Sequence, residues 1–281
     1  MSREAPADPA AFYDEYGERE WERLDRDFHH RLEWEATTDY LERYLPAEGR
    51  VLDAGGGAGR YAVWFARRGH DVTLLDASRG QATLAREKAA EHGVPDRVSV
   101  ARADVRALPV ADGTFDATLC LGGPLSHVLD AEERRAAAAD LRRATRPGAP
   151  VFVSVMGLLA SVTRVMRAAG RLDPERDETE LLPALVRDGD YDRELLDRFD
   201  REPTMAPMHL FRAAEFESLL EAAGLEVRTL AALEGPFSQR REDLDLLTGA
   251  HREAVRETVE TLREDRCVVD HSAHMLAVCR A

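Results

Sequence analysis

The sequence has few cysteines and no long apolar run. Its three cysteines, Cys120, Cys267 and Cys279, are odd in number and widely spaced, and no C-x-x-C pair occurs among them. This excludes a disulfide framework and argues against a zinc site, so we expect no metal. No stretch approaches the ~20 apolar residues of a membrane helix, and residues 1–8 lack the charged and apolar regions of a signal peptide. We therefore expect a cytoplasmic protein without membrane insertion.

Lysine is nearly absent as well. Lys88 is the only lysine, arginine is abundant, and the net charge is −15. Such an acidic surface repels nucleic-acid phosphates, so we expect no nucleic-acid partner. A GC-rich genome would account for the exchange of lysine for arginine. Like-charge repulsion is also tolerated in concentrated salt, where the Debye length falls to about 3 Å at 1 M. The charge favours a salt-adapted cytosol and resembles that of proteins from halophilic archaea.

The most informative stretch runs from Val51 to Arg60. A short apolar run ends in the acid Asp53, a glycine-dense turn follows, and a helix is predicted over 60–68. Strand, tight loop and helix in this order are typical of a nucleotide site in an open α/β sheet. A dinucleotide-binding G-x-G-x-x-G pattern starting at Gly55 would need glycine at position 60, where Arg60 stands. The sequence has D-x-G-x-G-x-G instead.

This D-x-G-x-G-x-G pattern resembles the first motif of the class I S-adenosylmethionine (SAM)-dependent methyltransferases. An acid before the loop would repel a pyrophosphate, but it suits the cationic methionine part of SAM. The resemblance implies an α/β fold with a Rossmann-like seven-stranded sheet that is mostly parallel with an antiparallel last strand, together with N-terminal helices and a helical lid insertion. It also implies that SAM is bound by Asp53, Gly55, Gly57 and Gly59.

Two further predicted strands end in acids. The strand over 71–76 ends at Asp76, about twenty residues beyond the glycines, where an acid accepts hydrogen bonds from ribose hydroxyls in SAM and NAD sites alike. Asp76 and its neighbour Ala77 are therefore candidate cofactor-binding residues. After the strand over 97–103, a D-x-x-x-L-P segment resembles the adenine-binding region of the same family. The resemblance implies that Asp104 accepts from the adenine amino group and that the N–H of Val105 donates to a ring nitrogen.

The fourth predicted strand, 115–121, ends in candidate cofactor-binding residues Leu121 and Gly122. Methyltransferases that act on DNA-base amino groups usually carry Asn- or Asp-Pro-Pro-aromatic here, and this sequence does not. The segment that leads to His127 instead resembles the Gly-Pro-Leu-(Tyr or Ser)-His stretch of small methyltransferases related to the ubiquinone and menaquinone type. The resemblance covers residues 10–157 well and the remainder loosely.

The chemistry predicted for this segment is simple. Methyl transfer requires the acceptor lone pair to be held in line with the sulfur, at about 3–3.5 Å from the methyl carbon, with water excluded. A general base is needed only for an acceptor that carries a proton. His127 is the candidate base and substrate-binding residue, and His209 is the second candidate. The predicted N-terminal helix could cover the site with Tyr13 or Tyr16 facing the pocket, and Tyr16 is the candidate taken for substrate binding. Arg60 is a further candidate, although it could instead bind the carboxylate of SAM or lie exposed on its helix.

We expect residues 1–281 to form a single methyltransferase domain. Its expected parts are an N-terminal helical cap (10–45), a SAM-binding core (46–157), a helical lid insertion (158–212) and the C-terminal part of the sheet (213–281). Strands are predicted over 225–231 and 273–279, the second antiparallel, and one long charged helix over 242–265. The insertion could equally form a dimer contact, and the sequence does not give the oligomeric state.

The sequence predicts a SAM-dependent methyltransferase that acts on a small-molecule acceptor, and three alternatives stay open. A nicotinamide-dependent oxidoreductase would have the same fold and the same use for Asp76. Its glycine pattern, however, requires a glycine at position 60, where this sequence has Arg60. A non-catalytic SAM-binding regulatory protein would bind the cofactor without turnover. An RNA methyltransferase is disfavoured by the negative charge. The acceptor atom, whether oxygen, nitrogen, sulfur or carbon, is not indicated.

Overall fold

The computed structural model describes residues 8–169 and 177–281 and contains a seven-stranded sheet. The strand order is β3-β2-β1-β4-β5-β9-β8, and β9 runs antiparallel to both of its neighbours. The mostly parallel sheet with an antiparallel last strand is therefore confirmed. The strands are β1 (Arg50–Ala54), β2 (Asp71–Asp76), β3 (Val98–Arg102), β4 (Ala117–Cys120), β5 (Pro150–Met156), β8 (Glu226–Ala232) and β9 (His274–Arg280).

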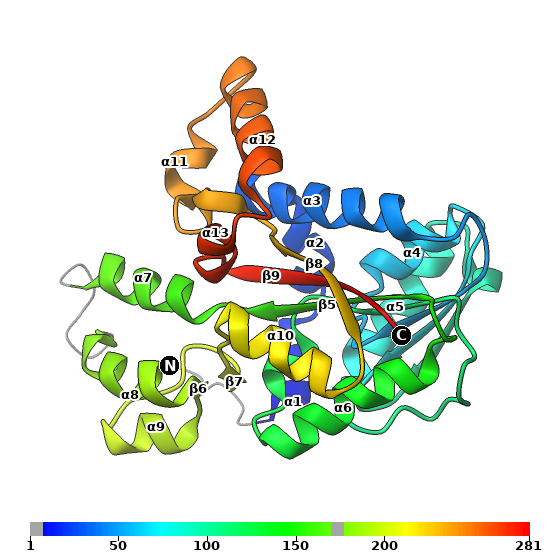
Figure 1. Ribbon diagram of the computed structural model, residues 1–281, viewed down its shortest axis with the longest axis horizontal. Helices are drawn as coiled ribbons and strands as arrows, with labels where there is room; N and C mark the ends of the chain where they lie inside the picture. The colour runs from blue at the N-terminus through cyan, green and yellow to red at the C-terminus, as the bar shows by residue number, and fades with distance from the viewer. Residues whose placement is uncertain (1–7, 170–176) are drawn as a thin grey trace.

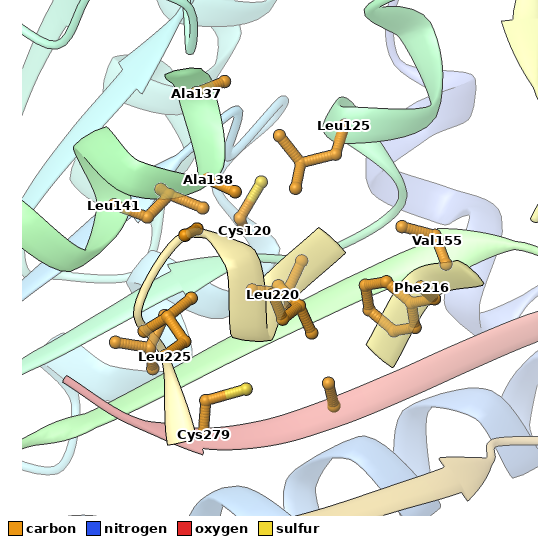
Figure 2. Close-up of a cluster of buried hydrophobic side chains, with 14 of the residues drawn as sticks. Cys120, Leu125, Ala137, Ala138, Leu141, Val155, Phe216, Leu220, Leu225 and Cys279 are labelled. Carbon is orange, nitrogen blue, oxygen red and sulfur yellow. The ribbon is translucent and has the colours of Figure 1, made fainter. Parts of the chain in front are cut away.

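Helices cover both faces of this sheet (Figure 1). One face buries apolar residues of α3 (Phe28–Tyr44), α4 (Arg60–Ala66) and α5 (Arg79–Glu91). The other face packs against α6 (Ala131–Ala144), α10 (Ala213–Ala222) and α13 (Arg266–Asp270). Figure 2 shows part of this second layer, in which Leu141, Phe216 and Leu220 pack over Cys120 and Val155 of the central strands. Burial of these apolar side chains on both faces stabilises the sheet that carries the site.

The N-terminal segment is broken into short pieces ahead of α3. They are α1 (Pro9–Tyr16), α2 (Arg19–Glu22) and the 3-10 helix η1 (Arg23–Asp25). Gly17, with φ of +58°, ends α1, and the side chain of Asp27 caps the start of α3. The chain therefore turns twice, and α1 lies against the start of α5. There the carboxylate of Asp14 accepts hydrogen bonds from the Ser78 hydroxyl (2.5 Å) and the Gly80 N–H (2.7 Å).

The segment between β5 and α10 is helical, and residues 170–176 of it lie outside the described part of the chain. In the described part of this segment the α-helices are α7 (Leu158–Ala168), α8 (Leu182–Asp188) and α9 (Arg193–Arg198). Leucines of these helices, among them Leu158, Leu185 and Leu195, belong to an apolar cluster separate from those of the sheet. The segment also contains η5 (Thr179–Leu181), β6 (Asp190–Tyr191) and β7 (Met208–His209).

The prediction of one long helix over 242–265 is wrong. Two helices occupy that range, α11 (Arg241–Asp245) and α12 (Ala250–Leu262), and the break falls at Gly249, whose φ is +48°. Both pack on the first turns of α3, where Leu244 and Val259 contact an apolar cluster that includes Phe28. Short 3-10 helices complete the fold at η2 (Pro95–Arg97), η3 (Pro124–His127) and η6 (Gly235–Phe237). Over residues 8–169 and 177–281, no helix has the length and apolarity to cross a membrane.

Candidate functional site

A cavity of about 370 Å³ lies at the carboxyl ends of β1, β2, β3 and β4. Its walls combine the loops after these strands with α1, α2 and η1 from the N-terminal segment. In an open α/β sheet this edge is where ligands bind. The structure therefore brings together most of the predicted site. The predicted residues on the cavity wall are Gly55, Gly57, Arg60, Asp76, Ala77, Asp104, Val105, Leu121, Gly122 and His127.

The glycine loop is held flat against the sheet edge by its own backbone. The N–H of Gly55 donates to the carbonyl of Leu75 (2.7 Å), and that of Gly57 donates to Oδ2 of Asp76 (2.8 Å). Gly55 has a φ of +75°, and a Cβ placed there would lie 2.4 Å from Cγ of Pro124. Only glycine fits this position, because any side chain would strike the next loop. Gly59 begins α4 and does not line the cavity.

Asp76 faces the cavity with acceptor capacity to spare. Its Oδ1 accepts from the N–H of Ser78 (2.8 Å) and its Oδ2 from Gly57. A carboxylate has about four lone-pair sites, so two remain for ligand hydroxyls. Burial raises the pKa of Asp76, and the charge of Asp14 adds to that effect. The position suits the predicted ribose contact, which stays a prediction.

Asp53 lies under the glycine loop and does not line the cavity. It is 1% exposed, and a Cβ at Gly56 would lie 2.6 Å from its Oδ2. Neither oxygen has a hydrogen-bonding partner of normal geometry. Burial, together with the charge of Asp76, raises the pKa of Asp53 to about 7. An unpaired buried carboxyl is costly, and a cation in the cavity above would stabilise its charged form.

Asp104 is already engaged by a neighbour. Its Oδ1 accepts from the backbone N–H and the Nε of Arg106 (2.9 and 3.0 Å), and its Oδ2 accepts from Nη2 of Arg106 (2.7 Å). These hydrogen bonds lower the pKa of Asp104. The implied adenine contact therefore has to share this carboxylate with Arg106. The N–H of Val105, at the same edge of the cavity, has no such competitor among the hydrogen bonds of the described chain.

His127 presents one ring nitrogen to each of two segments. Nδ1 lies 2.8 Å from the carbonyl oxygen of Pro207, and Nε2 lies 3.2 Å from the hydroxyl of Tyr13. A carbonyl only accepts, so we assign the proton of the neutral ring to Nδ1, and Nε2 then accepts from the Tyr13 O–H. Burial lowers the pKa of His127. His127 is therefore neutral at pH 7, with its basic nitrogen at the cavity.

The second predicted histidine is not in the cavity, and the assignment of His209 to the substrate is corrected. Its ring lies between Oδ1 of Asp190 and Oε1 of Glu215, at 2.7 Å from each. Burial alone would lower the pKa of His209, but the hydrogen bonds to these carboxylates raise it overall. Both ring nitrogens of His209 therefore already have hydrogen-bonding partners within the protein. Spacing in the sequence cannot reveal such a contact between β7, β6 and α10.

Tyr16 is corrected in the same way, because its neighbour on α1 takes the predicted place. Tyr13 lines the cavity and Tyr16 does not. The ring of Tyr16 stacks instead on Phe12 and under the guanidinium of Arg19. The two tyrosines are three residues apart on a short helix. The hydrogen bonds of Asp14 to α5 orient that helix and so decide which tyrosine faces inward.

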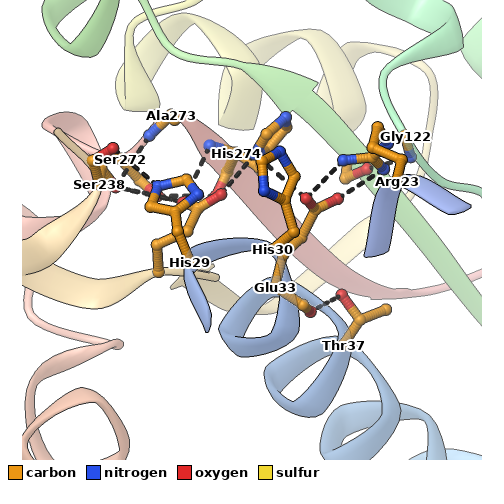
Figure 3. Close-up of polar contacts among 12 residues, drawn as sticks. Arg23, His29, His30, Glu33, Thr37, Gly122, Ser238, Ser272, Ala273 and His274 are labelled. Carbon is orange, nitrogen blue, oxygen red and sulfur yellow. Dashed lines mark hydrogen bonds and ion pairs between the residues drawn. The ribbon is translucent and has the colours of Figure 1, made fainter. Parts of the chain in front are cut away.

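Several cavity residues from the N-terminal segment escape sequence reasoning, among them Glu20 and Arg23. The guanidinium of Arg23 donates Nη1 and Nη2 to the two carboxylate oxygens of Glu33 (2.6 and 2.9 Å). Figure 3 shows His274 beside Glu33, with which it forms an ion pair. His274 is also paired with Glu234. Burial lowers the pKa of His274, but the charges of Glu33 and Glu234 together raise it to about 9.

This buried cluster could attract a metal, because ligand atoms of Glu33, Glu234 and His274 lie within 4.8 Å of one another. Arg23 and the protonated His274 supply two positive charges to the two carboxylates. The cluster is thus neutralised by its own side chains, and we assign it to holding η1 and α3 against the end of β9. No signal in the sequence joins residues so far apart.

The residues present fit the predicted cofactor. The three glycines at 55–57 carry no side chains, which allows close approach of a ligand to their backbone N–H groups. Asp76 retains acceptor sites for hydroxyls, and the unpaired carboxyl of Asp53 beneath the loop would be stabilised by a positive group above it. A pyrophosphate would meet the opposite electrostatics at both acids.

Comparisons with known proteins agree with this fit. Residues 51–148 match the family model described as a methyltransferase domain. The chain is 32% identical over 184 residues to the methyltransferase GfsG of Streptomyces halstedii, an alignment that covers 63% of this chain and 64% of GfsG. It is 30% identical over 166 residues to a protein of Encephalitozoon cuniculi assigned to the methyltransferases, covering 58% of this chain and 73% of that protein.

A similar fold occurs in a solved structure of a SAM-dependent methyltransferase from Methanosarcina mazei. The TM-score is 0.55 at 18% identity, and the superposition covers 86% of this chain and 96% of the other. At that identity the likeness concerns the fold alone. The chain spans 64% of the length of GfsG, so the relatives carry segments that it does not match.

Proposed function

Because this chain belongs to the class I SAM-dependent methyltransferases, we propose that it transfers a methyl group from SAM to a small-molecule acceptor in the cavity beside His127. One observation carries the proposal. The glycine loop, Asp76 and the unprotonated Nε2 of His127 line the same cavity. A cofactor and a methyl acceptor bound together in this cavity would therefore have a proton acceptor beside them. The family membership leaves the nicotinamide alternative without support.

In this proposal the cofactor is held by the loops after the first three strands. Gly55 and Gly57 would hold the methionine part of SAM. Asp76 and Ala77 would contact the ribose. Asp104 and Val105 would contact the adenine. Leu121 and Gly122 would close the far wall. When bound, SAM supplies a methyl carbon that is electrophilic because it is attached to a sulfonium. The protein's task is to orient the acceptor and to exclude water.

His127 is proposed as the general base. Its Nε2 is unprotonated at neutral pH and lies at the cavity, so it can take the proton of an acceptor as the new bond forms. Pro207, which follows the helices of the insertion, accepts from Nδ1–H and favours this tautomer. The insertion therefore contributes to the site through a backbone carbonyl and not through His209.

Titration of the purified protein with SAM by calorimetry tests the proposal. Replacing Asp76 with Ala removes the ribose acceptors, and we expect the Kd for SAM to rise on the order of 10- to 100-fold, the value of one or two charge-assisted hydrogen bonds. Asp71→Ala is the matched control, because Asp71 lies exposed at the other end of the same strand. Absence of SAM binding to the wild-type protein would refute the proposal.

The same assay separates an enzyme from a regulatory module. Binding of SAM without methylation of any acceptor would favour a non-catalytic SAM-binding protein. Labelling of bulk RNA with radioactive SAM would favour an RNA substrate, against the net charge of −15. Location in the cytoplasm stays a prediction.

Salt adaptation is part of the proposal. A net charge of −15 with a single lysine makes the folded state sensitive to self-repulsion at low ionic strength. We expect the far-ultraviolet circular dichroism signal at 2 M KCl to exceed that at 50 mM KCl, and the melting temperature to rise with salt. Equal melting temperatures at both concentrations would assign the composition to codon usage alone.

A further inference from the structure

We propose that the acceptor presents a neutral hydroxyl group, of phenol or alcohol type, to Nε2 of His127, and that the Tyr13 hydroxyl marks the place where it binds. This inference rests on the proposed function and adds the chemical class of the acceptor. It depends on the hydrogen-bonding pattern of His127 and on the pairing of the arginines around the cavity.

The first argument is the state of the imidazole. Pro207 accepts from Nδ1 at 2.8 Å, so the neutral ring carries its lone pair on Nε2. A group that contacts Nε2 must therefore bring a hydrogen-bond donor. The Tyr13 hydroxyl does so at 3.2 Å, and this is the only hydrogen bond of that hydroxyl within the described residues. A carboxylate has no proton to offer and would be repelled by the lone pair.

The second argument is the pairing of the positive side chains. Three arginines line the cavity, and each is engaged by a carboxylate. Arg23 is bound through both terminal nitrogens by Glu33, Arg60 is paired with Asp25, and Arg106 with Asp104. The described part of the wall thus offers no unpaired cation to an anionic acceptor. Glu20 and Asp76 lie on the same wall and would disfavour a carboxylate or phosphate further.

The third argument is the shape of the place that Tyr13 fills. Its ring meets the His127 ring edge to face, with centroids 5.5 Å apart and planes at 79°. An aromatic hydroxyl compound can therefore adopt the contact that the protein makes with its own phenol. Tyr13 belongs to α1, which is held to the body of the protein near this point by Asp14 and by Gln81. A small rotation of the tyrosine side chain would release the place to a ligand.

The proposed step is balanced without a further reagent. The acceptor O–H bond breaks, and its proton passes to Nε2 of His127. The oxygen forms a bond to the methyl carbon, and the pair of the former carbon–sulfur bond returns to sulfur as a thioether. The imidazolium then loses its proton to water. Pro207 acts as a positioning residue, since its carbonyl keeps the basic nitrogen directed at the acceptor.

The experiment uses p-cresol, which is the side chain of tyrosine as a free molecule. In Tyr13→Ala, p-cresol can occupy the space of the deleted ring, and ¹⁵N-edited NMR of labelled histidine reports its contact with Nε2. We expect p-cresol to bind this variant and to shift the Nε2 resonance. Adding His127→Ala should weaken the binding at least tenfold. The isosteric probe 4-methylaniline and the larger, anionic probe 4-methylbenzoate should each bind at least tenfold more weakly than p-cresol.

Several outcomes would overturn the inference. These are tighter binding of the benzoate or the aniline, binding of p-cresol that does not depend on His127, and no binding at all. Tyr13→Phe keeps the packing and serves if Tyr13→Ala does not fold. In that variant and in the wild-type protein the Nε2 resonance must be that of an unprotonated nitrogen at pH 7, and a protonated Nε2 would also reject the inference. Calorimetry with SAM on the same proteins detects failure of the proposed function separately.

Discussion

The cavity around His127 and the base of the insertion around His209 place the same side chain in opposite surroundings. His127 meets a carbonyl and a phenol, neither of them charged, and its pKa is lowered. His209 lies between two carboxylates, and its pKa is raised. The surroundings of His127 thus favour its neutral form, whereas those of His209 favour the charged form, which joins β6 to α10. Burial lowers the pKa of both rings; the two carboxylates beside His209 reverse that effect, whereas the carbonyl of Pro207 does not outweigh burial at His127.

The largest expected contrast is in turnover. In the Tyr13→Ala background, with p-cresol and radioactive SAM, we expect His127→Ala to reduce methylation about 100-fold or more, the usual contribution of a general base. His209→Ala in the same background should reduce it less than about threefold, because its ring is outside the cavity. The measurement is the rate of label transfer to p-cresol. Equal losses of methylation rate in the two variants would contradict the assignment of His127, and not His209, to the reaction.

The next contrast is in stability. His209→Ala removes the cation from between two partly exposed carboxylates, and we expect the free energy of unfolding in urea at pH 6 to fall by about 1–2 kcal/mol. The raised pKa of His209 means that its contribution is complete below the pKa of the unfolded chain and is lost as pH rises through the folded pKa. The difference between wild type and variant should therefore shrink between pH 6 and pH 9. His271→Ala, at an exposed histidine, is the control and should show little change at either pH.

A smaller effect compares the two pKa values directly. Tyr13→Phe removes a donor to the neutral form of His127, so the pKa of His127 should rise. Asp190→Asn removes a partner of the charged form of His209, so the pKa of His209 should fall. Titration of both rings by NMR in each variant checks the two directions at once. A shift of the same sign in both would mean that burial, and not the partners, controls the two rings.

The smallest effect concerns the buried acid beneath the glycine loop. Asp53, with a pKa of about 7, should lose part of a proton when a cation binds above it, because the cation lowers that pKa. Calorimetry of SAM binding at pH 7 in phosphate and in Tris should reveal release of less than one proton. Asp53→Asn should abolish the release, and S-adenosylhomocysteine, which lacks the sulfonium charge, should cause less of it. Identical proton release with both ligands would contradict this role.

Sequence reasoning succeeded where the site is built from residues next to strand ends. The strand predicted over 71–76 has the bounds that the structure gives for β2. Each motif after a strand lies on the cavity because parallel strands end at one edge of the sheet. Asp53 is the exception, since alternation along β1 directs it under the loop.

The sequence could not supply what depends on contacts between distant segments. Tyr13 and Tyr16 are equivalent by spacing, and the choice follows from the docking of Asp14 on Ser78 and Gly80. His209 forms hydrogen bonds with two carboxylates from other elements. Arg23 is bound by Glu33, ten residues further along the chain. The break between α11 and α12 depends on a left-handed Gly249 within an otherwise continuous charged pattern. Helical periodicity alone does not report a single residue of this kind.

The ion pairs behind the cavity connect its wall to a strand that is distant in the sequence. His274 begins β9, which lies in the sheet between β5 and β8. Glu33 pairs both with His274 and with Arg23, and Arg23 lines the cavity. The position of one wall of the ligand site therefore depends on the pairing of β9 in the sheet, although β9 itself carries none of the cofactor motifs.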